Sequence, residues 1–189
     1  MDFITSDLHF YHNNILKFSH KTRPFKDVDH MVEMLIQEWN SLAGVNDNVY
    51  HLGDFSFGKY HKTLEVLNRL NGRIHFIKGN HDSREVFKKL IKETTANVVW
   101  FKDYHEMKHN NTLITMTHYP FEIWRDSHKG SVHLHGHTHG SMPSVGRRVD
   151  VGYDSYGKII SLDKAVEDTL KLKIHAPDIH KQKGNSYDY

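Results

Sequence analysis

The chain has 189 residues, 38% of them hydrophobic and 25% charged, which is the composition of an ordinary globular protein. Its formal net charge of +2 gives no strong electrostatic attraction to nucleic acid, and the absence of cysteine excludes disulfides and a thiolate zinc site. A cysteine-free chain suits a reducing compartment, and no apolar stretch is long enough to span a bilayer, so we expect a cytoplasmic protein with no membrane partner. The 18 histidines favour a metal site, because neutral imidazole is a common metal ligand.

The first half of the chain alternates short apolar runs with amphipathic segments. The apolar runs predict strands at residues 3–5, 49–52 and 74–77. Helical spacing of apolar residues predicts helices at 29–43, at Leu64–Leu70 and after Ser83. Asp27 or Asp29 can cap the first of these helices, and Gly44 can end it. This β-α-β-α-β-α order favours a largely parallel sheet with helices on its outer side.

The second half has a different character, with several strands joined by short connections. We predict strands at 98–101, 113–117, 132–135, 148–151 and 159–162. A last helix is predicted to begin near Asp163, and the chain becomes polar beyond about Lys173. The pattern therefore predicts a single domain over residues 1–172, followed by a loosely ordered polar tail over 173–189.

Five polar clusters each follow directly after a predicted strand. They are Asp7-Leu8-His9, Gly53-Asp54, Gly79-Asn80-His81-Asp82, Thr117-His118-Tyr119-Pro120 and His135-Gly136-His137-Thr138-His139-Gly140. In α/β proteins, groups at the carboxyl ends of neighbouring strands meet in one crevice. Their carboxylate, imidazole and amide donors suit Mn, Fe, Ni, Zn or Mg rather than soft Cu(I). The sequence therefore predicts one metal-binding site built from five separate segments.

The order D-x-H, G-D, G-N-H-D, H, G-H-x-H resembles that of the calcineurin-like metallophosphoesterase superfamily over residues 3–162. The resemblance implies an α/β fold in which a two-sheet β-sandwich is flanked by helices. Each piece alone has an ordinary interpretation. Asp7 and Gly53-Asp54 can be turn residues, Gly79-Asn80 can be a β-turn, and His118 can be a core histidine. Their joint occurrence at successive strand ends is what favours the metal site.

The resemblance also implies which residues hold two divalent metal ions. The first ion would be held by Asp7, His9, Asp54 and His139. The second would be held by Asp54, Asn80, His118 and His137. Asp54 would bridge the two ions, which in such centres lie roughly 3.5–4 Å apart. Mn²⁺ is the metal that we expect first, and Fe, Ni, Zn or Mg also suit these ligands.

The implied reaction is hydrolysis of a phosphoester by a metal-bound hydroxide. His81, which takes no metal in this scheme, would be catalytic and would donate a proton or a hydrogen bond near the leaving group. Asp82 can orient His81, or it can serve the core or cap a helix instead. The stretch Gly53-Asp54-Phe55-Ser56-Phe57-Gly58 lacks the second Asp and the Arg-Gly of the phosphoprotein phosphatases. A protein phosphatase is therefore not expected, and a diester is favoured over a monoester.

The residues around these clusters look more like those of small bacterial and phage members of the superfamily. The similar stretches are Ser6 to Ile15, Arg23-Pro24-Phe25, Trp39-Asn40-Ser41 and Trp124-Arg125. We expect a small phosphoester substrate, with a nucleotide as a candidate. Five residues are candidates for substrate contact, namely His12, Asn13, Asn14, Tyr119 and Arg125. Ordinary loop structure is the competing interpretation for each of them. His133 and His135 share one face of their strand, and His135 is the better candidate for supporting the ligands.

Two other functions are weighed against this one. A nuclease would use the same metals but needs a basic groove, and the pairs Lys88-Lys89 and Arg147-Arg148 are too sparse to establish one. A metal-binding interaction module without turnover would be expected to have lost ligands, and none is lost here.

Overall fold

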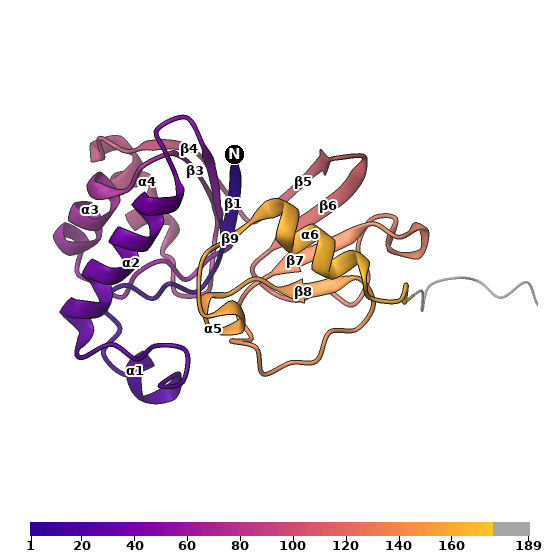
Figure 1. The fold of residues 1–189 in the computed structure, drawn as a ribbon. Coiled ribbons are helices and arrows are strands. Elements are labelled where there is room, and N and C mark those ends of the chain that lie inside the picture. Colours follow the sequence, from indigo (N-terminus) through magenta and orange to yellow (C-terminus); the bar gives the residue numbers. More distant parts are fainter. Residues whose placement is uncertain (176–189) are drawn as a thin grey trace, which may run out of the picture.

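The structure is a computed structural model that describes residues 1–175, and it contains two β-sheets (Figure 1). The first sheet has the strand order β4-β3-β2-β1-β9. Its strands are β1 (Asp2–Thr5), β2 (Asn48–His51), β3 (Arg73–Ile77), β4 (Asn97–Lys102) and β9 (Ile160–Ser161). Strands β1 to β4 run parallel, and β9 pairs antiparallel with β1. The predicted parallel sheet is therefore present. Residues 176–189 of the expected polar tail lie outside the described residues.

The second sheet has four strands in the order β5-β6-β7-β8. They are β5 (Tyr104–His109), β6 (Thr112–Thr117), β7 (Val132–His135) and β8 (Arg148–Asp150). Strands β5 and β6 form an antiparallel hairpin, whereas β6, β7 and β8 are parallel. The carboxyl ends of β6 and β7 therefore point the same way, which brings the loops that follow them together.

Helices cover the first sheet on the side away from the second sheet (Figure 1). They are α2 (Val28–Leu42), α3 (Tyr60–Arg69) and α4 (Arg84–Glu93), and α6 (Leu162–Leu170) contacts strands of both sheets. The short helices are α1 (Ile15–Phe18), α5 (Tyr153–Tyr156) and a 3₁₀ turn, Ser127–Lys129. Asp27 and Ser83 cap α2 and α4 by accepting hydrogen bonds from the backbone N–H groups of His30 and Val86. Among residues 1–175, no helix has the length and apolar character that crossing a bilayer requires.

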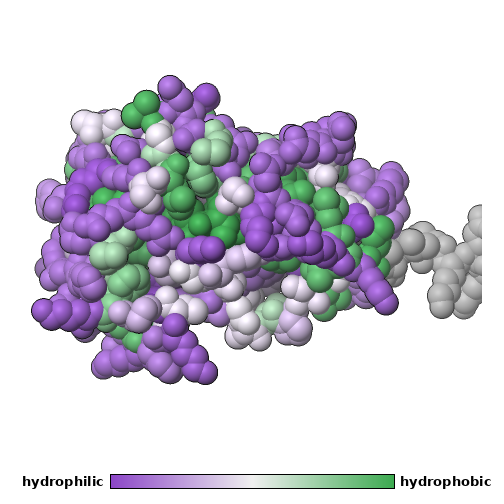
Figure 2. Space-filling view, in the orientation of Figure 1, coloured by the Kyte–Doolittle hydropathy of each residue, from purple (hydrophilic) through white to green (hydrophobic). Residues whose placement is uncertain are grey.

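The strands of the first sheet alternate their side chains between two apolar cores. Phe3 and Val49 pack with the helices, whereas Ile4 and Tyr50 face the second sheet. Ile114 and the other inward residues of the second sheet complete the core between the sheets. Hydrophilic side chains cover most of the face shown in Figure 2. Burial on both faces of the first sheet fixes the register of its strands. The predicted two-sheet sandwich flanked by helices is confirmed.

Two differences from the predicted elements have identifiable physical causes. Strand β5 was not predicted, because Tyr104–His109 is largely polar and contains no apolar run. The strand predicted at 159–162 is shortened to Ile160–Ser161, because the Ser161 side chain accepts a hydrogen bond from the Lys164 N–H and so begins α6.

Gly79 allows the loops after β2 and β3 to touch. A Cβ atom at this position would lie 2.2 Å from the Asp54 backbone nitrogen and 2.2 Å from Asp54 Oδ1. These atoms belong to a buried segment that cannot easily move away. Glycine is therefore required here for close approach, and its location is what brings the third polar cluster against Asp54.

Replacing Gly79 with alanine tests this close approach. Gly79→Ala should lower the free energy of unfolding by about 3 kcal/mol, the upper end of the cost of overpacking a buried site. Gly157→Ala is the matched control, because Gly157 has a φ of +66° but a Cβ atom added there would have no other atom within 4 Å. The control should cost about 1 kcal/mol, for backbone strain alone. Denaturant unfolding followed by circular dichroism measures both, and equal losses would contradict the packing argument.

Candidate metal centre

The five predicted clusters meet at the carboxyl ends of β1, β2, β3, β6 and β7, as expected from the sequence. Several of the predicted ligands lie in turns with left-handed backbone. The φ angles are 56° for Asp7, 51° for His9, 57° for Asp54, 71° for His137 and 49° for His139. Such conformations cost about 1–3 kcal/mol each in residues other than glycine, and they gather at functional sites. The surrounding fold therefore holds these side chains in a costly but convergent arrangement.

The first candidate group consists of Asp7, His9 and His139, whose ligand atoms all lie within 4.8 Å of one another. Asp7 is fully buried and His9 is nearly so. Asp7 Oδ2 also accepts a hydrogen bond of 2.9 Å from the backbone N–H of His137, which ties the first loop to the last one. This group can hold a metal ion.

The second candidate group consists of Asp54, His118 and His137, which satisfy the same 4.8 Å criterion. The imidazole of His118 is fixed by a hydrogen bond of 2.8 Å from Nδ1 to the Leu52 carbonyl, so Nε2 faces the site. Asn80 Oδ1 lies 2.8 Å from this Nε2 atom, which places the predicted amide ligand in the same group.

Asp54 lies between the two groups. Its Oδ2 atom is 3.8 Å from His9 Nε2 of the first group and 3.6 Å from His118 Nε2 of the second. Its Oδ1 atom accepts a hydrogen bond of 2.9 Å from the backbone N–H of His81. The Asp54 side chain is buried, so the surrounding protein fixes the location of its carboxylate between the two groups.

Buried atoms in the first group fit a bound cation. Among the described residues, Asp7 Oδ1 and His9 Nε2 are buried and have no hydrogen-bond partner. Burial raises the pKa of the Asp7 carboxyl to about 8, because a buried negative charge is unfavourable without a nearby positive one. Burial also lowers the pKa of His9 to about 2, which keeps its imidazole in the neutral form that binds metals. The donor set therefore suits a divalent ion.

A buried ion pair supports the first group from behind. Arg23 donates from Nε to Asp154 Oδ1 at 2.8 Å, and from Nη2 to the Asp7 carbonyl at 2.6 Å. His139 Nδ1 donates to Asp154 Oδ2 at 2.7 Å, so its Nε2 atom is left for a metal. Burial raises the pKa of Asp154, but the hydrogen bonds from His139 and Arg23 outweigh it and hold the pKa below the usual range. Asp154 therefore orients His139 as a carboxylate.

A second carboxylate fixes the backbone of the same loop. Asp150 Oδ2 accepts hydrogen bonds from the Thr138 hydroxyl and from the Gly140 N–H at 3.0 Å. Its Oδ1 atom accepts from the Gly152 N–H at 2.7 Å. Because Thr138 and Gly140 flank His139, this carboxylate fixes the turn from which the imidazole projects.

The Asp82 carboxylate binds backbone N–H groups, whereas one interpretation of the sequence was that it orients His81. Its carboxylate accepts hydrogen bonds from the backbone N–H groups of Asp54 at 2.9 Å, Phe55 at 3.0 Å and Gly79 at 2.8 Å. Burial raises its pKa to about 6, although these three donors act in the opposite direction. Asp82 therefore joins the loops after β2 and β3, which agrees with the alternative of a core role.

His81 projects from the buried centre towards solvent. Its side chain is 48% exposed, and its Nε2 atom lies 4.0 Å from Asp54 Oδ2. The ring of Phe57 lies 4.5 Å from that of His81 and is stacked on His12 at 4.1 Å. These three rings therefore form one wall beside the candidate ligands.

A cleft of about 660 Å³ opens over the candidate ligands. His12 lines it, as do His9, His81, His137 and His139. Tyr119 is half exposed, and its ring lies 4.6 Å from that of His137, so it borders the second group.

The other candidates for substrate contact lie elsewhere. Asn13 and Asn14 are exposed and do not line this cleft, and Asn14 precedes α1. Arg125 pairs with Glu106 at 3.0 Å and is also outside the cleft lining. His133 and His135 are buried; His133 Nε2 accepts from the Phe121 N–H, and His135 Nδ1 donates to the Gly136 carbonyl. His135 therefore supports the loop of the last two ligands through its backbone.

Sequence reasoning missed Arg23, Asp150 and Asp154 as parts of the site. Asp150 lies near the end of a predicted strand, and Asp154 lies just after that strand. The five polar clusters were recognised by the same kind of placement. Arg23 belongs to the quoted Arg-Pro-Phe stretch but gives no local sign that its guanidinium reaches the first ligand loop.

No protein-family model matches the chain. An uncharacterized protein of Methanocaldococcus jannaschii is 33% identical over 141 residues, which cover 74% of this chain and 69% of that protein. A solved protein of unknown function from Aquifex aeolicus has the same fold, with a TM-score of 0.65 and 23% identity over 89% of this chain and 98% of its own. A phosphoesterase from E. coli matches at 18% identity and a TM-score of 0.42, over 80% of this chain and 77% of its own.

The fold gathers the ordered set of motifs at one centre. The two sheets and their flanking helices agree with the architecture that the motifs imply. The chain belongs to the same family as the Methanocaldococcus jannaschii protein, and its set of motifs resembles that of the calcineurin-like metallophosphoesterase superfamily.

Proposed function

We propose that the chain is a metal-dependent phosphoester hydrolase with a centre for two divalent ions, with Mn²⁺ the metal expected first among several that suit the ligands. The observation that carries this proposal is the location of Asp54. Its Oδ2 atom lies 3.8 Å from a histidine of one candidate group and 3.6 Å from a histidine of the other. A carboxylate in that position has the two acceptor oxygens that bridging requires.

The residues divide between the two ions as the motifs imply. Asp7, His9 and His139 would hold one ion, Asn80, His118 and His137 would hold the other, and Asp54 would contact both. When bound, the ions supply a lowered pKa for water and polarisation of the phosphoryl oxygens. Because Asp7 and Asp54 are the carboxylates among the ligands, a loaded centre keeps a net positive charge and attracts the anionic phosphoryl group.

His81 is the proposed catalytic residue outside the metal ligands. Its half-exposed imidazole next to Asp54 supports contact with a substrate whose phosphoryl group lies at the centre. There it would donate a hydrogen bond or a proton to the departing ester oxygen. The backbone hydrogen bond from its N–H to Asp54 Oδ1 holds the start of this side chain in place.

A small substrate is better supported than a nucleic acid strand. The described residues that line the cleft include no lysine or arginine, whereas binding of a nucleic acid backbone depends on such cations. The exposed rings of Phe57 and Tyr119 beside the ligands can stack on a planar group. A nucleotide is therefore our proposed substrate class, and hydrolysis of a diester is favoured by the missing phosphoprotein-phosphatase motif.

Replacing the bridging carboxylate should abolish the reaction. Asp54→Asn is expected to lower hydrolysis of bis(p-nitrophenyl) phosphate with Mn²⁺ by at least about 10³-fold, because the shared charge is lost from both groups. Calorimetric titration should also show weaker binding of Mn²⁺. The exposed carboxylate Asp163 gives the control Asp163→Asn, which should behave as the unaltered chain does. Retained activity in Asp54→Asn would refute the two-ion assignment.

The role of His81 is tested by varying the leaving group. His81→Ala should slow hydrolysis of alkyl esters by about 10²- to 10³-fold, since a poor leaving group needs a proton. It should slow p-nitrophenyl esters much less, because their leaving group is stable as an anion. His61→Ala, at an exposed histidine on α3, is the control. An equal effect on both ester types would argue against proton donation by His81.

Asp154 should influence metal affinity through His139. Asp154→Asn is expected to weaken binding of one of the two ions about 10- to 100-fold, the usual effect of losing a carboxylate that orients a ligand histidine. Isothermal titration calorimetry with Mn²⁺ measures this directly, and circular dichroism checks that the variant is folded. Glu33→Gln, which disrupts the exposed Arg69–Glu33 pair, provides the comparison. Unchanged affinity for both ions in Asp154→Asn would contradict this role.

A further inference from the structure

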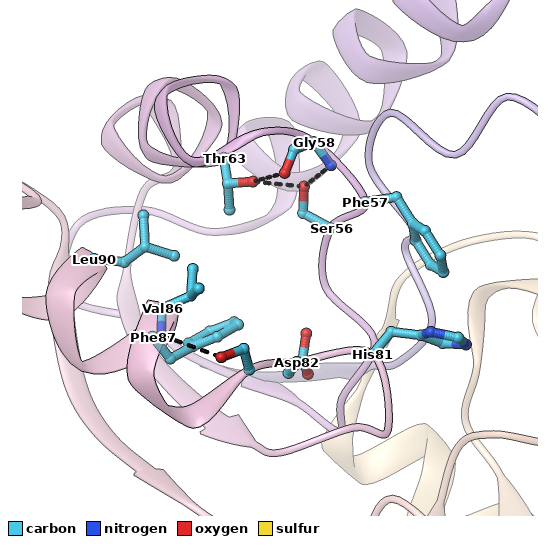
Figure 3. Close-up of a pocket in the computed structure, with 10 residues that line it drawn as sticks. Ser56, Phe57, Gly58, Thr63, His81, Asp82, Val86, Phe87 and Leu90 are labelled. Carbon is cyan, nitrogen blue, oxygen red and sulfur yellow. Dashed lines mark hydrogen bonds between the residues drawn. The ribbon is translucent and has the colours of Figure 1, made fainter.

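A second cavity, of about 280 Å³, adjoins the metal cleft at His81. It lies between the loop that follows β2 and the first turns of α3 and α4. Figure 3 shows Phe57 and His81 at one end of this cavity and Val86, Phe87 and Leu90 at the other. His81 lines both this cavity and the metal cleft, so the two spaces meet at its side chain.

Several polar groups of the second cavity already have hydrogen-bond partners in the protein. Ser56 Oγ lies 2.9 Å from Thr63 Oγ1 and accepts a hydrogen bond of 3.0 Å from the Gly58 N–H (Figure 3). The Asp82 carboxylate is taken up by its three backbone donors. Among the described residues, the lining contains no lysine, arginine or glutamate. Nothing in the cavity therefore requires a charged ligand.

The remaining lining is apolar and partly aromatic. Its members are Phe57, Val86, Phe87 and Leu90. Cavities that hold a whole drug-sized ligand span about 300–1,000 Å³, so a space of about 280 Å³ suits a fragment, such as one aromatic ring or a nucleobase. The cavity is therefore matched in size and polarity to a single uncharged, planar group.

We propose that this cavity binds the leaving arm of a phosphodiester, and that this arm is an uncharged aromatic or nucleoside-like alcohol. The inference rests on the proposed function, since it places the phosphoryl group at the metal centre. An arm that enters the cavity passes His81, whose imidazole then lies beside the ester oxygen that departs. The retained arm stays in the larger metal cleft, which is why a diester is the substrate that occupies both spaces.

The reaction assigned to this arrangement is hydrolysis. The oxygen of water forms a bond to phosphorus, and the bond from phosphorus to the oxygen of the cavity arm breaks. One proton of the water ends on that departing oxygen, so the products are a phosphomonoester and a neutral alcohol. The alcohol leaves from a cavity whose one carboxylate, Asp82, is already hydrogen-bonded to backbone groups, so apolar contact is what holds the alcohol there.

A bulky side chain placed in the cavity should weaken the binding of diesters with large arms more than that of diesters with small arms. Val86 lines the cavity from α4 and is 40% exposed, so Val86→Trp can place an indole in the space with little disturbance of the core. Its KM for bis(p-nitrophenyl) phosphate should rise about tenfold relative to its KM for bis(2,2,2-trifluoroethyl) phosphate, whose arms are small. Release of p-nitrophenol is followed by absorbance, and release of trifluoroethanol by fluorine NMR. Val99→Trp is the matched control, because Val99 is 41% exposed on β4 and lies outside the cavity lining.

The outcomes distinguish this inference from the function on which it rests. A selective rise in KM in Val86→Trp, absent from Val99→Trp, supports the cavity as the site of the leaving arm. Equal changes for both diesters, or no change for either, overturn the inference while the hydrolase remains. If the unaltered, Mn²⁺-loaded chain hydrolyses neither diester, the proposed function fails and the inference fails with it. Val86→Phe repeats the test with a smaller ring if circular dichroism shows that Val86→Trp does not fold.

Discussion

The constraint on which this structure depends is the location of a buried carboxylate, Asp54, at the junction of two groups of candidate metal-binding side chains. Its Oδ2 atom faces a histidine from each group, and its Oδ1 atom is held by the backbone of His81. Negative charge in such a place is unfavourable unless cations or donors compensate it. The tight contact at Gly79 and the convergence of five strand ends are the means by which the fold brings these groups together. A bound cation, as proposed above, would compensate the carboxylates gathered there.

The buried charged residues next to the candidate ligands are also held in place by hydrogen bonds. Arg23 links the backbone of the first ligand loop to Asp154, and Asp154 in turn fixes His139. Asp82 joins the two loops around Asp54 through backbone donors. These buried partners offset the strain of left-handed φ angles at the ligands, so the geometry is set before any substrate arrives. The exposed rings of His81 and Phe57 are left open for the proposed contact with a substrate.

The sequence alone predicted the parallel sheet and the convergence of the five polar clusters, because a strand end is visible as an apolar run followed by polar residues. It failed where the signal is tertiary. Strand β5 is polar in sequence and exists because it pairs with β6. The contact between Arg23 and Asp154 joins positions 131 residues apart, which no local pattern reveals. The three amides that occupy Asp82 come from two loops, so its role as a backbone anchor could not be chosen over the orienting of His81 from the sequence. The second cavity likewise exists only because α3 and α4 pack beside the loop after β2.

That Asp54 bridges two metal ions is tested most directly by electron paramagnetic resonance of the chain loaded with Mn²⁺. Two ions that share a carboxylate roughly 3.5–4 Å apart are magnetically coupled, so we expect two Mn²⁺ per chain and the spectrum of an exchange-coupled pair. Binding of a single Mn²⁺ at saturation, or of two ions that give the spectrum of isolated Mn²⁺, would contradict the shared centre.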